Sequence, residues 1–506
     1  MLDLLLFPLA VLYLMVIGML FVYGVNFLYL TFLAWSIARR DKPSSAKWPP
    51  LTKWPKVTVQ LPIYNELYVA KRLIEATAQL DYPNELLEIQ VLDDSTDETR
   101  QVIRQAVAEA QAQGINIAHL HRTERTGFKA GALQAGMASA HGEFIAIFDA
   151  DFVPIPSFLK QTLPSFMDSQ VAFVQTRWGH LNPRYSFLTL LQSLAIDGHF
   201  MIEQFARSRG GHWFNFNGTA GVWRRTALVD AGGWTADTLT EDLDLSYRAY
   251  LRGWRGEYLR DIEVPAELPV SFSGYRRQQH RWARGSLECA VKLSAQVWQA
   301  SIPLKHKVQA TLHLTGYGVH LLLFTLTLFY PLVLLLSQRY PDLIVFFGIA
   351  YFFNLTALAP TLFFTVGQQQ LGRRWWRLLP NILFIMVLGS GMMLNTVRAA
   401  GQILFKSQTI FERTAKFGIG EQKQEWTRQH YQLNLDSIVY LELLFALYNI
   451  ITVWVAIRLA NWAIAFYALL FAIGLLYVAG MTILQAIAVY RNRNKSKITP
   501  ILDARF

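Results

Sequence analysis

The sequence predicts an α/β domain with a mainly parallel sheet, inserted between transmembrane α-helices. Hydrophobic residues make up 53% of the 506-residue chain, and they concentrate in the first forty residues and in most of the last two hundred. The intervening segment, from about residue 57 to residue 307, alternates short apolar runs with amphipathic stretches and regular charges. Aqueous and lipid environments are therefore expected to alternate along the chain.

The N-terminal segment is expected to cross the membrane once. Residues 4–37 carry no charged side chain, and a helix of that length, rising about 1.5 Å per residue, exceeds the roughly 30 Å hydrocarbon core. The segment is too long for a cleaved signal peptide and lacks the basic start. We predict one long or tilted helix within residues 1–40 and a Pro-rich linker at 41–56. The cations that follow place its C-terminal end in the cytoplasm: Arg39, Arg40, Lys42 and Lys47.

A soluble domain is predicted at residues 57–270. Short apolar or β-branched runs alternate there with amphipathic helices at about 67–79 and 98–111. This order implies a mainly parallel sheet with covered faces, in which ligands gather at the carboxyl ends of strands. Interfacial amphipathic helices are expected at 271–310. The expected strands are Val57–Leu61, Leu87–Leu92, Ile115–Leu120, Glu143–Phe148 and Val171–Gln175.

The C-terminal part, residues 311–490, is predicted to be mostly transmembrane. Crossings by all its apolar runs would leave the C-terminus outside, whereas the basic tail at 491–506 should stay inside. We therefore interpret 380–404, which contains Gly389, Asn395 and Arg398, as interfacial or re-entrant. This leaves five crossings in the chain and a cytosolic loop at 405–436. The apolar runs are 311–336, 342–366, 380–404, 437–457 and 462–489.

Charge and cysteine content narrow the class of protein. The net charge is +11, but the cations flank apolar segments, as at Arg373, Arg374 and Arg377. That placement favours anionic lipid headgroups as partners and argues against nucleic acid. Because Cys289 is the single cysteine, no intrachain disulfide forms, which fits a reducing compartment for the soluble part.

An acidic pair, Asp149-Ala-Asp151, follows the expected strand Glu143–Phe148. Two carboxylates at a strand end can hold a hard divalent cation together with a diphosphate, and the cation stabilises a departing nucleotide diphosphate. Two solvated aspartates in a turn would show the same pattern. The apolar strand before them favours the metal-binding interpretation.

A second acidic pair, Asp93-Asp94, follows the strand Leu87–Leu92. One carboxylate of such a pair can bind a ribose or base, although Ser95 to Asp97 also resemble a helix start. The first strand ends near Tyr64 and Glu66, which supply an aromatic ring and a carboxylate to the same nucleotide pocket. Lys129 can neutralise phosphate, or it is a surface lysine before a helix.

Three further motifs are ambiguous when taken alone. In Thr240-Glu241-Asp242, an acid can deprotonate an acceptor hydroxyl, or the acids are ordinary partners of a helix macrodipole. In Gln278-x-x-Arg281-Trp282, the indole can stack on a sugar and the arginine can bind phosphate, or the motif belongs to an interfacial helix. A cytosolic loop with Phe411, Thr414 and Lys416 can close over a diphosphate.

In order, these motifs resemble those of the family 2 inverting glycosyltransferases of the cellulose synthase superfamily. The ordered set is Asp93-Asp94, Asp149-x-Asp151, Thr240-Glu241-Asp242 and Gln278-x-x-Arg281-Trp282. The flanking runs at 216–224 and 267–282 resemble cellulose-synthase-like mannan and glucomannan synthases. The resemblance covers about residues 50–300 and the loop at 411–416.

The resemblance implies an A-type glycosyltransferase fold and an in-line displacement with inversion. By position, Asp242 is the expected general base, beside Glu241, and Asp149 and Asp151 are expected to hold diphosphate and Mg²⁺ or Mn²⁺. The expected nucleotide-binding residues are Tyr64, Glu66, Asp93, Asp94, Lys129 and Asp149. Gln278, Arg281 and Trp282 are expected at the acceptor and pyrophosphate, and Phe411, Thr414 and Lys416 in a gating loop. Arg413 stands where bacterial cellulose synthases usually have valine.

Two functions from one class, and one from another, fit these motifs. The first is a processive β-1,4-glycan synthase that extends a mannan, glucomannan or glucan from GDP-mannose or UDP-glucose and moves the polymer across the membrane. The second is a lipid glycosyltransferase with a diacylglycerol, ceramide or polyprenyl-phosphate acceptor. The third is a transporter or receptor with a degenerate sugar-binding domain, which the intact acidic set disfavours. A cytosolic catalytic domain is expected at the plasma membrane of a bacterium or the Golgi of a eukaryote, and homo-oligomers are left open.

Overall fold

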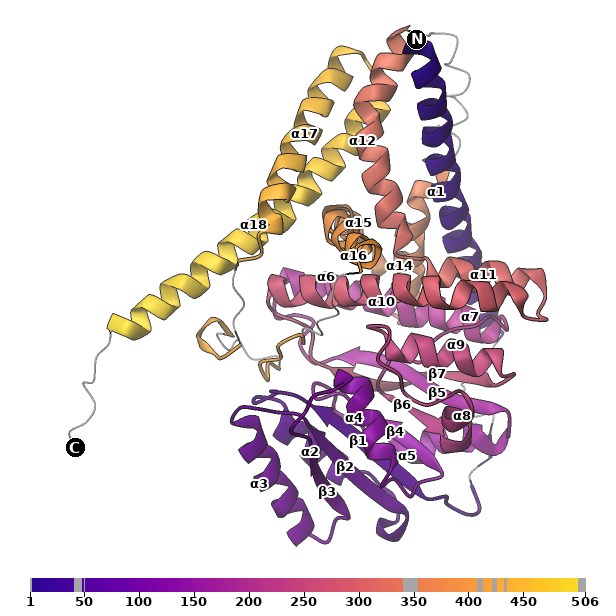
Figure 1. The fold of residues 1–506 in the computed structure, drawn as a ribbon, viewed down its shortest axis with the longest axis vertical. Coiled ribbons are helices and arrows are strands. Elements are labelled where there is room, and N and C mark those ends of the chain that lie inside the picture. The colour runs from indigo at the N-terminus through magenta and orange to yellow at the C-terminus, as the bar shows by residue number, and fades with distance from the viewer. Residues whose placement is uncertain are drawn as a thin grey trace.

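The computed structural model describes residues 2–40, 48–49, 51–339, 354–406, 413–420, 426–431 and 435–498. A sheet domain forms one end of the molecule, and long helices extend from it toward the other end (Figure 1). The helix α10 (Phe272–Gln299) lies between these two parts. This arrangement confirms the predicted insertion of an α/β domain between apolar helices.

The sheet of the described chain has seven strands in the order β3-β2-β1-β4-β6-β5-β7. Parallel pairing joins β1 to β2 and β4, β2 to β3, and β5 to β7, while β6 runs antiparallel to both its neighbours. The sheet is therefore mainly parallel, as predicted. The strands are β1 Val57–Ile63, β2 Leu87–Asp93, β3 Ile117–His121, β4 Phe144–Ile147, β5 Val171–His180, β6 Gly221–Arg224 and β7 Arg255–Ala266.

Helices cover both faces of the sheet because its central strands are apolar on both sides. In β4, Phe144 and Ala146 belong to one hydrophobic core, and Ile145 and Ile147 belong to the other. The first core includes side chains of α2 and α3, and the second includes side chains of α4, α8 and α9. The helices of this domain are α2 Ala70–Ala78, α3 Thr99–Ala112, α4 Phe128–Met137, α5 Phe158–Thr162, α6 Phe187–Gly198, α7 Phe205–Arg209, α8 Arg225–Asp230 and α9 Glu241–Leu251.

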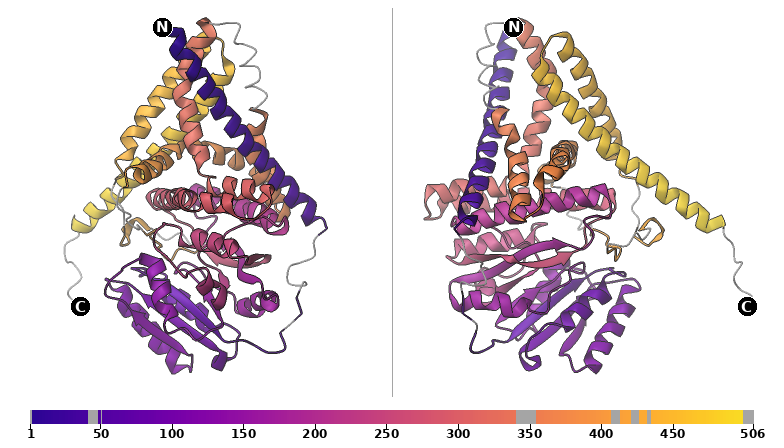
Figure 2. Two further views of the ribbon diagram at one scale, coloured as in Figure 1. Left: turned by 45° about the vertical axis from the view of Figure 1, so that its right-hand side comes forward. Right: turned by 180° about the vertical axis from the view of Figure 1, so that it is seen from behind.

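Beyond the domain, five helical segments among the described residues are long and apolar enough to cross a membrane. The first is within α1 (Leu2–Ala38), which matches the predicted N-terminal helix. The helices α17 and α18 lie side by side, as both views of Figure 2 show. The remaining helices are α11 Leu304–Leu314, α12 Gly318–Arg339, α14 Ala359–Gln370, α15 Trp375–Gly391, α16 Met393–Leu404, α17 Ile438–Arg458 and α18 Trp462–Ile498.

The helices α15 and α16 together make up one of these five segments by length and composition, Trp375–Leu404. They lie across the direction of α1 and α12, since Figure 1 views them end-on while α1 and α12 run in its plane. The helix α16 packs against α10. The interfacial or re-entrant placement of 380–404 stays a prediction that this orientation favours. Of the run 342–366, residues 342–353 lie outside the described residues.

One buried and one half-exposed ion pair connect the sheet domain to the apolar helices. Arg276 of α10 donates to Glu442 of α17, with 3.0 Å between Nη2 and Oε2, and to the Thr482 hydroxyl of α18 at 2.8 Å. Arg373 donates to Asp197 at the end of α6 at 2.6 Å. These contacts hold α10 and α6 firmly against the helices. The helix α18 continues through the start of the predicted basic tail, and residues 499–506 lie outside the described residues.

Candidate active site

A cavity of about 170 Å³ lies where the carboxyl ends of β1, β2 and β4 face α10. Its wall also includes the first turn of α9 and the segment 413–416. The acids Asp94, Asp149, Asp151 and Asp242 all line it, so residues from three separate acidic motifs share one site.

The cavity brings together most of the side chains that the motifs singled out. Asp93 does not line it, and Phe411 lies outside the described residues. The lining residues that were not assigned a role from the sequence include Arg125, Trp178, Asn217 and Arg413. The predicted residues that line it are Tyr64, Glu66, Asp94, Lys129, Asp149, Asp151, Glu241, Asp242, Gln278, Arg281, Trp282, Thr414 and Lys416.

Each aspartate of the Asp149-x-Asp151 pair contacts a lysine. Lys129 Nζ lies 2.6 Å from Asp149 Oδ1, and it donates to the Gly218 carbonyl at 2.9 Å. Lys416 Nζ lies 2.6 Å from Asp151 Oδ2. Burial raises the pKa of Asp149, which Lys129 opposes. The two cations therefore offset the repulsion between two carboxylates that sit side by side in a buried wall.

The donor chemistry of this acidic pair fits a hard divalent cation. Both aspartates present oxygen ligands alone, which Mg²⁺ and Mn²⁺ prefer, and both follow a buried strand that fixes their backbone. A cation there would compete with Lys129 and Lys416 for the same oxygens.

The second acid of Thr240-Glu241-Asp242 titrates near neutrality. Burial raises the pKa of Asp242 to about 7, the negative charge of Glu241 adds to this, and Lys129 opposes it. Asp242 Oδ1 also accepts from the Leu243 amide at 2.9 Å, in the first turn of α9. The helix-terminus role and a proton-accepting role are thus compatible in one residue.

The corner of the cavity formed by Tyr64, Glu66 and Asp94 combines buried acids with a cation stacked on an aromatic ring. Arg122 grips Asp94 with two bonds, of 2.8 Å from Nε and 2.6 Å from Nη2. The Arg125 guanidinium lies 3.5 Å from the Tyr64 ring centroid. Glu66 lies 3.2 Å from Arg413, and burial, which Arg413 opposes, raises its pKa to about 8. This corner therefore places a guanidinium stacked on an aromatic ring beside carboxylates that arginines hold in place.

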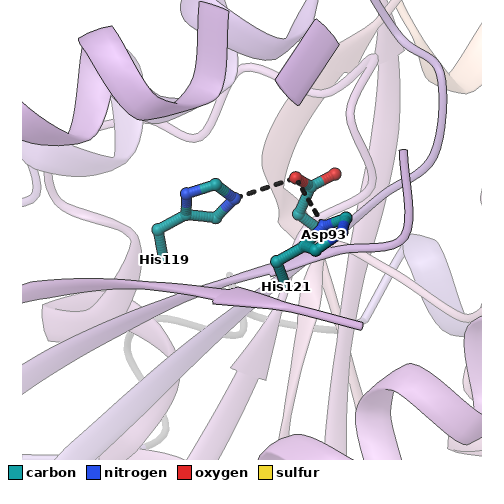
Figure 3. A group of neighbouring side chains, drawn as sticks. All are labelled: Asp93, His119 and His121. Carbon is teal, nitrogen blue, oxygen red and sulfur yellow. Dashed lines mark hydrogen bonds and ion pairs between the residues drawn. The ribbon is translucent and has the colours of Figure 1, made fainter. Parts of the chain in front are cut away.

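Asp93 points away from this corner. Its Oδ1 accepts from the Ser95 amide at 2.8 Å, and its Oδ2 contacts His119 and His121 (Figure 3). Burial alone would raise the pKa of Asp93, but the bonds from His119 and Ser95 hold it below its usual value. Of the adjacent aspartates, the structure therefore brings Asp94 to the cavity and leaves Asp93 behind it.

The motif Gln278-x-x-Arg281-Trp282 lies on α10, directly beside the apolar helices. Its three positions fall on one face of the helix, and all three side chains line the cavity. Burial lowers the pKa of Arg281, and the acids across the cavity, Glu241 first among them, oppose this. A fixed cation and an indole thus face the acidic wall.

Residues 413–420 lie against the opening between the sheet and α10. Thr414 and Lys416 line the cavity, whereas Ala415, Phe417 and Ile419 pack into a small apolar cluster with Val270. The Phe417 amide also donates to Glu267 Oε1 at 2.8 Å. This alternation seats the described part of the loop in the wall of the cavity.

The sheet domain is similar in sequence to known proteins. Residues 55–285 match the family described as "Glycosyltransferase like family 2". The chain is 46% identical over 265 residues to "Probable glucomannan 4-beta-mannosyltransferase 7" of Oryza sativa subsp. japonica, which covers 50% of this chain and 45% of that protein. It is 38% identical over 304 residues to "Glucomannan 4-beta-mannosyltransferase 7" of Arabidopsis thaliana, covering 58% of this chain and 55% of that protein. The chain thus spans about half the length of these relatives.

Among solved structures, a mannosyltransferase from Pyrobaculum calidifontis, in complex with GDP-Man and Mn²⁺, aligns with a TM-score of 0.49 at 21% identity. The alignment covers 78% of this chain and 100% of that one.

Proposed function

We propose that this chain, whose residues 55–285 match the family described as glycosyltransferase like family 2, extends a β-1,4-linked mannan or glucomannan from a nucleotide-sugar donor. GDP-mannose is the expected donor, and UDP-glucose the second. The observation that carries the proposal is the convergence of the acidic motifs and the α10 motif on one cavity. The relatives named as glucomannan 4-β-mannosyltransferases support the choice of sugar and linkage.

The reaction proposed is a single displacement with inversion. Asp242 accepts the proton of the acceptor hydroxyl, whose oxygen attacks the anomeric carbon of the donor sugar. The bond from that carbon to the diphosphate breaks, and the nucleoside diphosphate leaves. Arg281 faces the acidic wall where the diphosphate would lie and offsets part of its charge. Trp282, the next residue of α10, offers a face for the acceptor sugar.

Asp149 and Asp151 are the residues that would hold Mg²⁺ or Mn²⁺. When bound, the cation supplies positive charge that stabilises the departing diphosphate. Lys129 and Lys416 each contact one of these two carboxylates. If a cation took over the carboxylates, both lysines would be available to donate to phosphate oxygens. Lys416 lies in the segment that seats the loop, so donor binding and loop position are coupled.

The apolar helices place the acceptor beside the bilayer. The helix α10 carries the acceptor-side motif and packs against α16 and α18. The basic residues after α1 support a cytoplasmic position for the sheet domain. A growing polymer leaving Trp282 would therefore meet the membrane helices directly, which supports translocation by the same chain.

Product analysis tests the proposal. The purified chain, given a panel of radiolabelled nucleotide sugars, is expected to yield a polymer with β-1,4 linkages, most of it from GDP-mannose. A lipid carrying a single sugar would instead identify a lipid glycosyltransferase, which shares the donor site and takes its acceptor from the bilayer. Absence of transfer from every donor would contradict both functions.

The pH profile is expected to report the ionisation of Asp242. Its carboxyl must be deprotonated to accept a proton, so kcat/KM should fall about tenfold for each pH unit below the inflection and level off above it. Because burial and Glu241 raise the pKa of Asp242 to about 7, the inflection is expected near that pH. In Glu241→Gln, loss of the neighbouring charge should move it to lower pH. A profile that is flat from acid to neutral pH would contradict this assignment.

Arg122 is expected to matter for donor affinity. Arg122→Ala removes both bonds that orient Asp94, and charge-assisted bonds of this kind contribute about 1.5–3 kcal/mol. The donor KM should rise roughly tenfold or more, with a smaller change in kcat. Arg104→Ala, at an exposed position of α3, is the matched control and should leave both parameters unchanged. A roughly tenfold fall in kcat with the donor KM unchanged would contradict a donor-positioning role for Arg122.

A further inference from the structure

Behind the corner of the cavity formed by Tyr64, Glu66 and Asp94, three side chains bring potential metal ligands together. Asp93 Oδ2 lies 2.8 Å from His119 Nε2 and 3.3 Å from His121 Nδ1 (Figure 3). The ligand atoms of all three residues lie within 4.8 Å of one another. This cluster is separate from the Asp149-x-Asp151 pair, because Asp93 and both histidines are absent from the cavity lining.

Regular structure fixes the three positions. His119 and His121 are two residues apart on β3, so their side chains leave the same face of the strand. Asp93 pairs with His121 in the register between β2 and β3. The Ser95 amide holds Asp93 Oδ1 at 2.8 Å, which leaves Oδ2 to face the rings. The carboxylate is therefore oriented by a neighbouring bond, as metal-binding carboxylates commonly are.

The geometry and chemistry suit a cation of the zinc type. Bonds of about 2.0–2.2 Å in a tetrahedral site separate neighbouring ligand atoms by roughly 3.3–3.6 Å. The separation of 3.3 Å between Asp93 Oδ2 and His121 Nδ1 matches this range, and the separation of 2.8 Å between Asp93 Oδ2 and His119 Nε2 is shorter, so a bound cation would move the His119 ring outward. Two imidazoles and one carboxylate favour zinc-like transition cations, whereas Mg²⁺ and Ca²⁺ prefer oxygen ligands. The side chains of His119 and His121 are 16% and 17% exposed, so a cation and a fourth, water ligand can reach the site.

The competing explanation is a hydrogen-bonded trio without metal. It requires a proton on His119 Nε2 and on His121 Nδ1, with both bonds directed at one carboxylate oxygen. A bound cation would replace both protons. Because both imidazoles leave one face of β3 and are directed at one carboxylate oxygen, side-chain movements alone would bring the three ligand atoms around a metal.

We propose that Asp93, His119 and His121 form a binding site for one zinc-type divalent cation, independent of the transfer reaction. The site joins the end of β2 to the end of β3, directly before the Arg122–Asp94 ion pair in both strands. Asp94 follows Asp93, and Arg122 follows His121. The cation would therefore brace the donor side of the cavity from behind.

Zinc binding by the full chain tests the proposal. The purified protein, stripped with a chelator, is equilibrated with Zn²⁺ in excess Mg²⁺, and bound zinc is measured by mass spectrometry. One equivalent per chain is expected. The double variant His119→Gln/His121→Gln should lose it, and the control His141→Gln, whose side chain is 79% exposed in the same domain, should retain it. Equal zinc in the double variant and in the unaltered chain, or none in the unaltered chain, would overturn the proposal.

A second measurement does not depend on the folding of any variant. X-ray absorption at the zinc edge of the unaltered chain should show two imidazole nitrogens and oxygen at about 2.0–2.2 Å. A first shell without two imidazoles would overturn the site. Because neither measurement requires sugar transfer, failure here leaves the proposed glycosyltransferase function untouched, and failure of that function leaves zinc binding intact.

Discussion

Replacing Asp242 by asparagine is expected to abolish sugar transfer while the affinity for the donor stays within about twofold. Asparagine keeps the size of the side chain and can still face the Leu243 amide, but its amide cannot take up a proton. Loss of a positioned general base typically lowers the rate roughly 100-fold to 10,000-fold. The measurements are transfer of radiolabelled sugar and donor binding by calorimetry.

The control for this variant is Asp230→Asn, because Asp230 is an exposed aspartate at the end of α8. That variant should keep full activity. If Asp242→Asn retained turnover with a normal pH profile, the general base would have to be a different group. If Asp242→Asn instead lowered thermal stability and donor affinity together, the acid would serve the first turn of α9 alone.

The sheet was largely predictable because strands buried on both faces appear in the sequence as continuous apolar runs that end at clear turn residues. The predicted strand Leu87–Leu92 and the helix at 98–111 differ from β2 and α3 by a residue or so at each end. The strands β6 and β7 were not predicted. The strand β6 has four residues, too few to show a period. The strand β7 carries charges throughout, since Arg260, Asp261 and Glu263 interrupt its apolar pattern.

The site was predictable to the extent that its residues follow strands. Parallel strands end at the same edge of a sheet, so acids after β1, β2 and β4 had to meet. Which of two adjacent acids faces the ligand was not predictable, because successive side chains point to opposite sides of a strand and the register decides. That is why Asp94 lines the cavity and Asp93 faces His119. Arg125 and Trp178 come from a loop and a strand interior, where no local pattern marks them.

The second large effect is expected at the acidic pair. Asp149→Asn and Asp151→Asn should each lower transfer roughly 100-fold or more, because charge stabilisation of a departing diphosphate by a metal contributes several kcal/mol. Residual activity should require higher Mn²⁺ concentrations than in the unaltered chain. The measurement is transfer rate as a function of Mg²⁺ and Mn²⁺ concentration, at saturating donor.

The matched control for the acidic pair is Asp81→Asn, because Asp81 also contacts a lysine at 2.6 Å but lies on the surface. A surface ion pair contributes little to stability, so this variant should be unchanged in rate and in metal dependence. Because Lys129 and Lys416 neutralise Asp149 and Asp151 in this structure, a purely structural role of the two aspartates predicts a different result. If the aspartates serve only to pair with Lys129 and Lys416, then Asp149→Asn would lower thermal stability and leave the metal dependence of the rate unaltered. A shift in the metal dependence of the rate without a loss of thermal stability would instead show that these carboxylates hold the cation. The Lys129 and Lys416 ammonium groups would then occupy, in this structure, the positions at which the cation and the diphosphate bind.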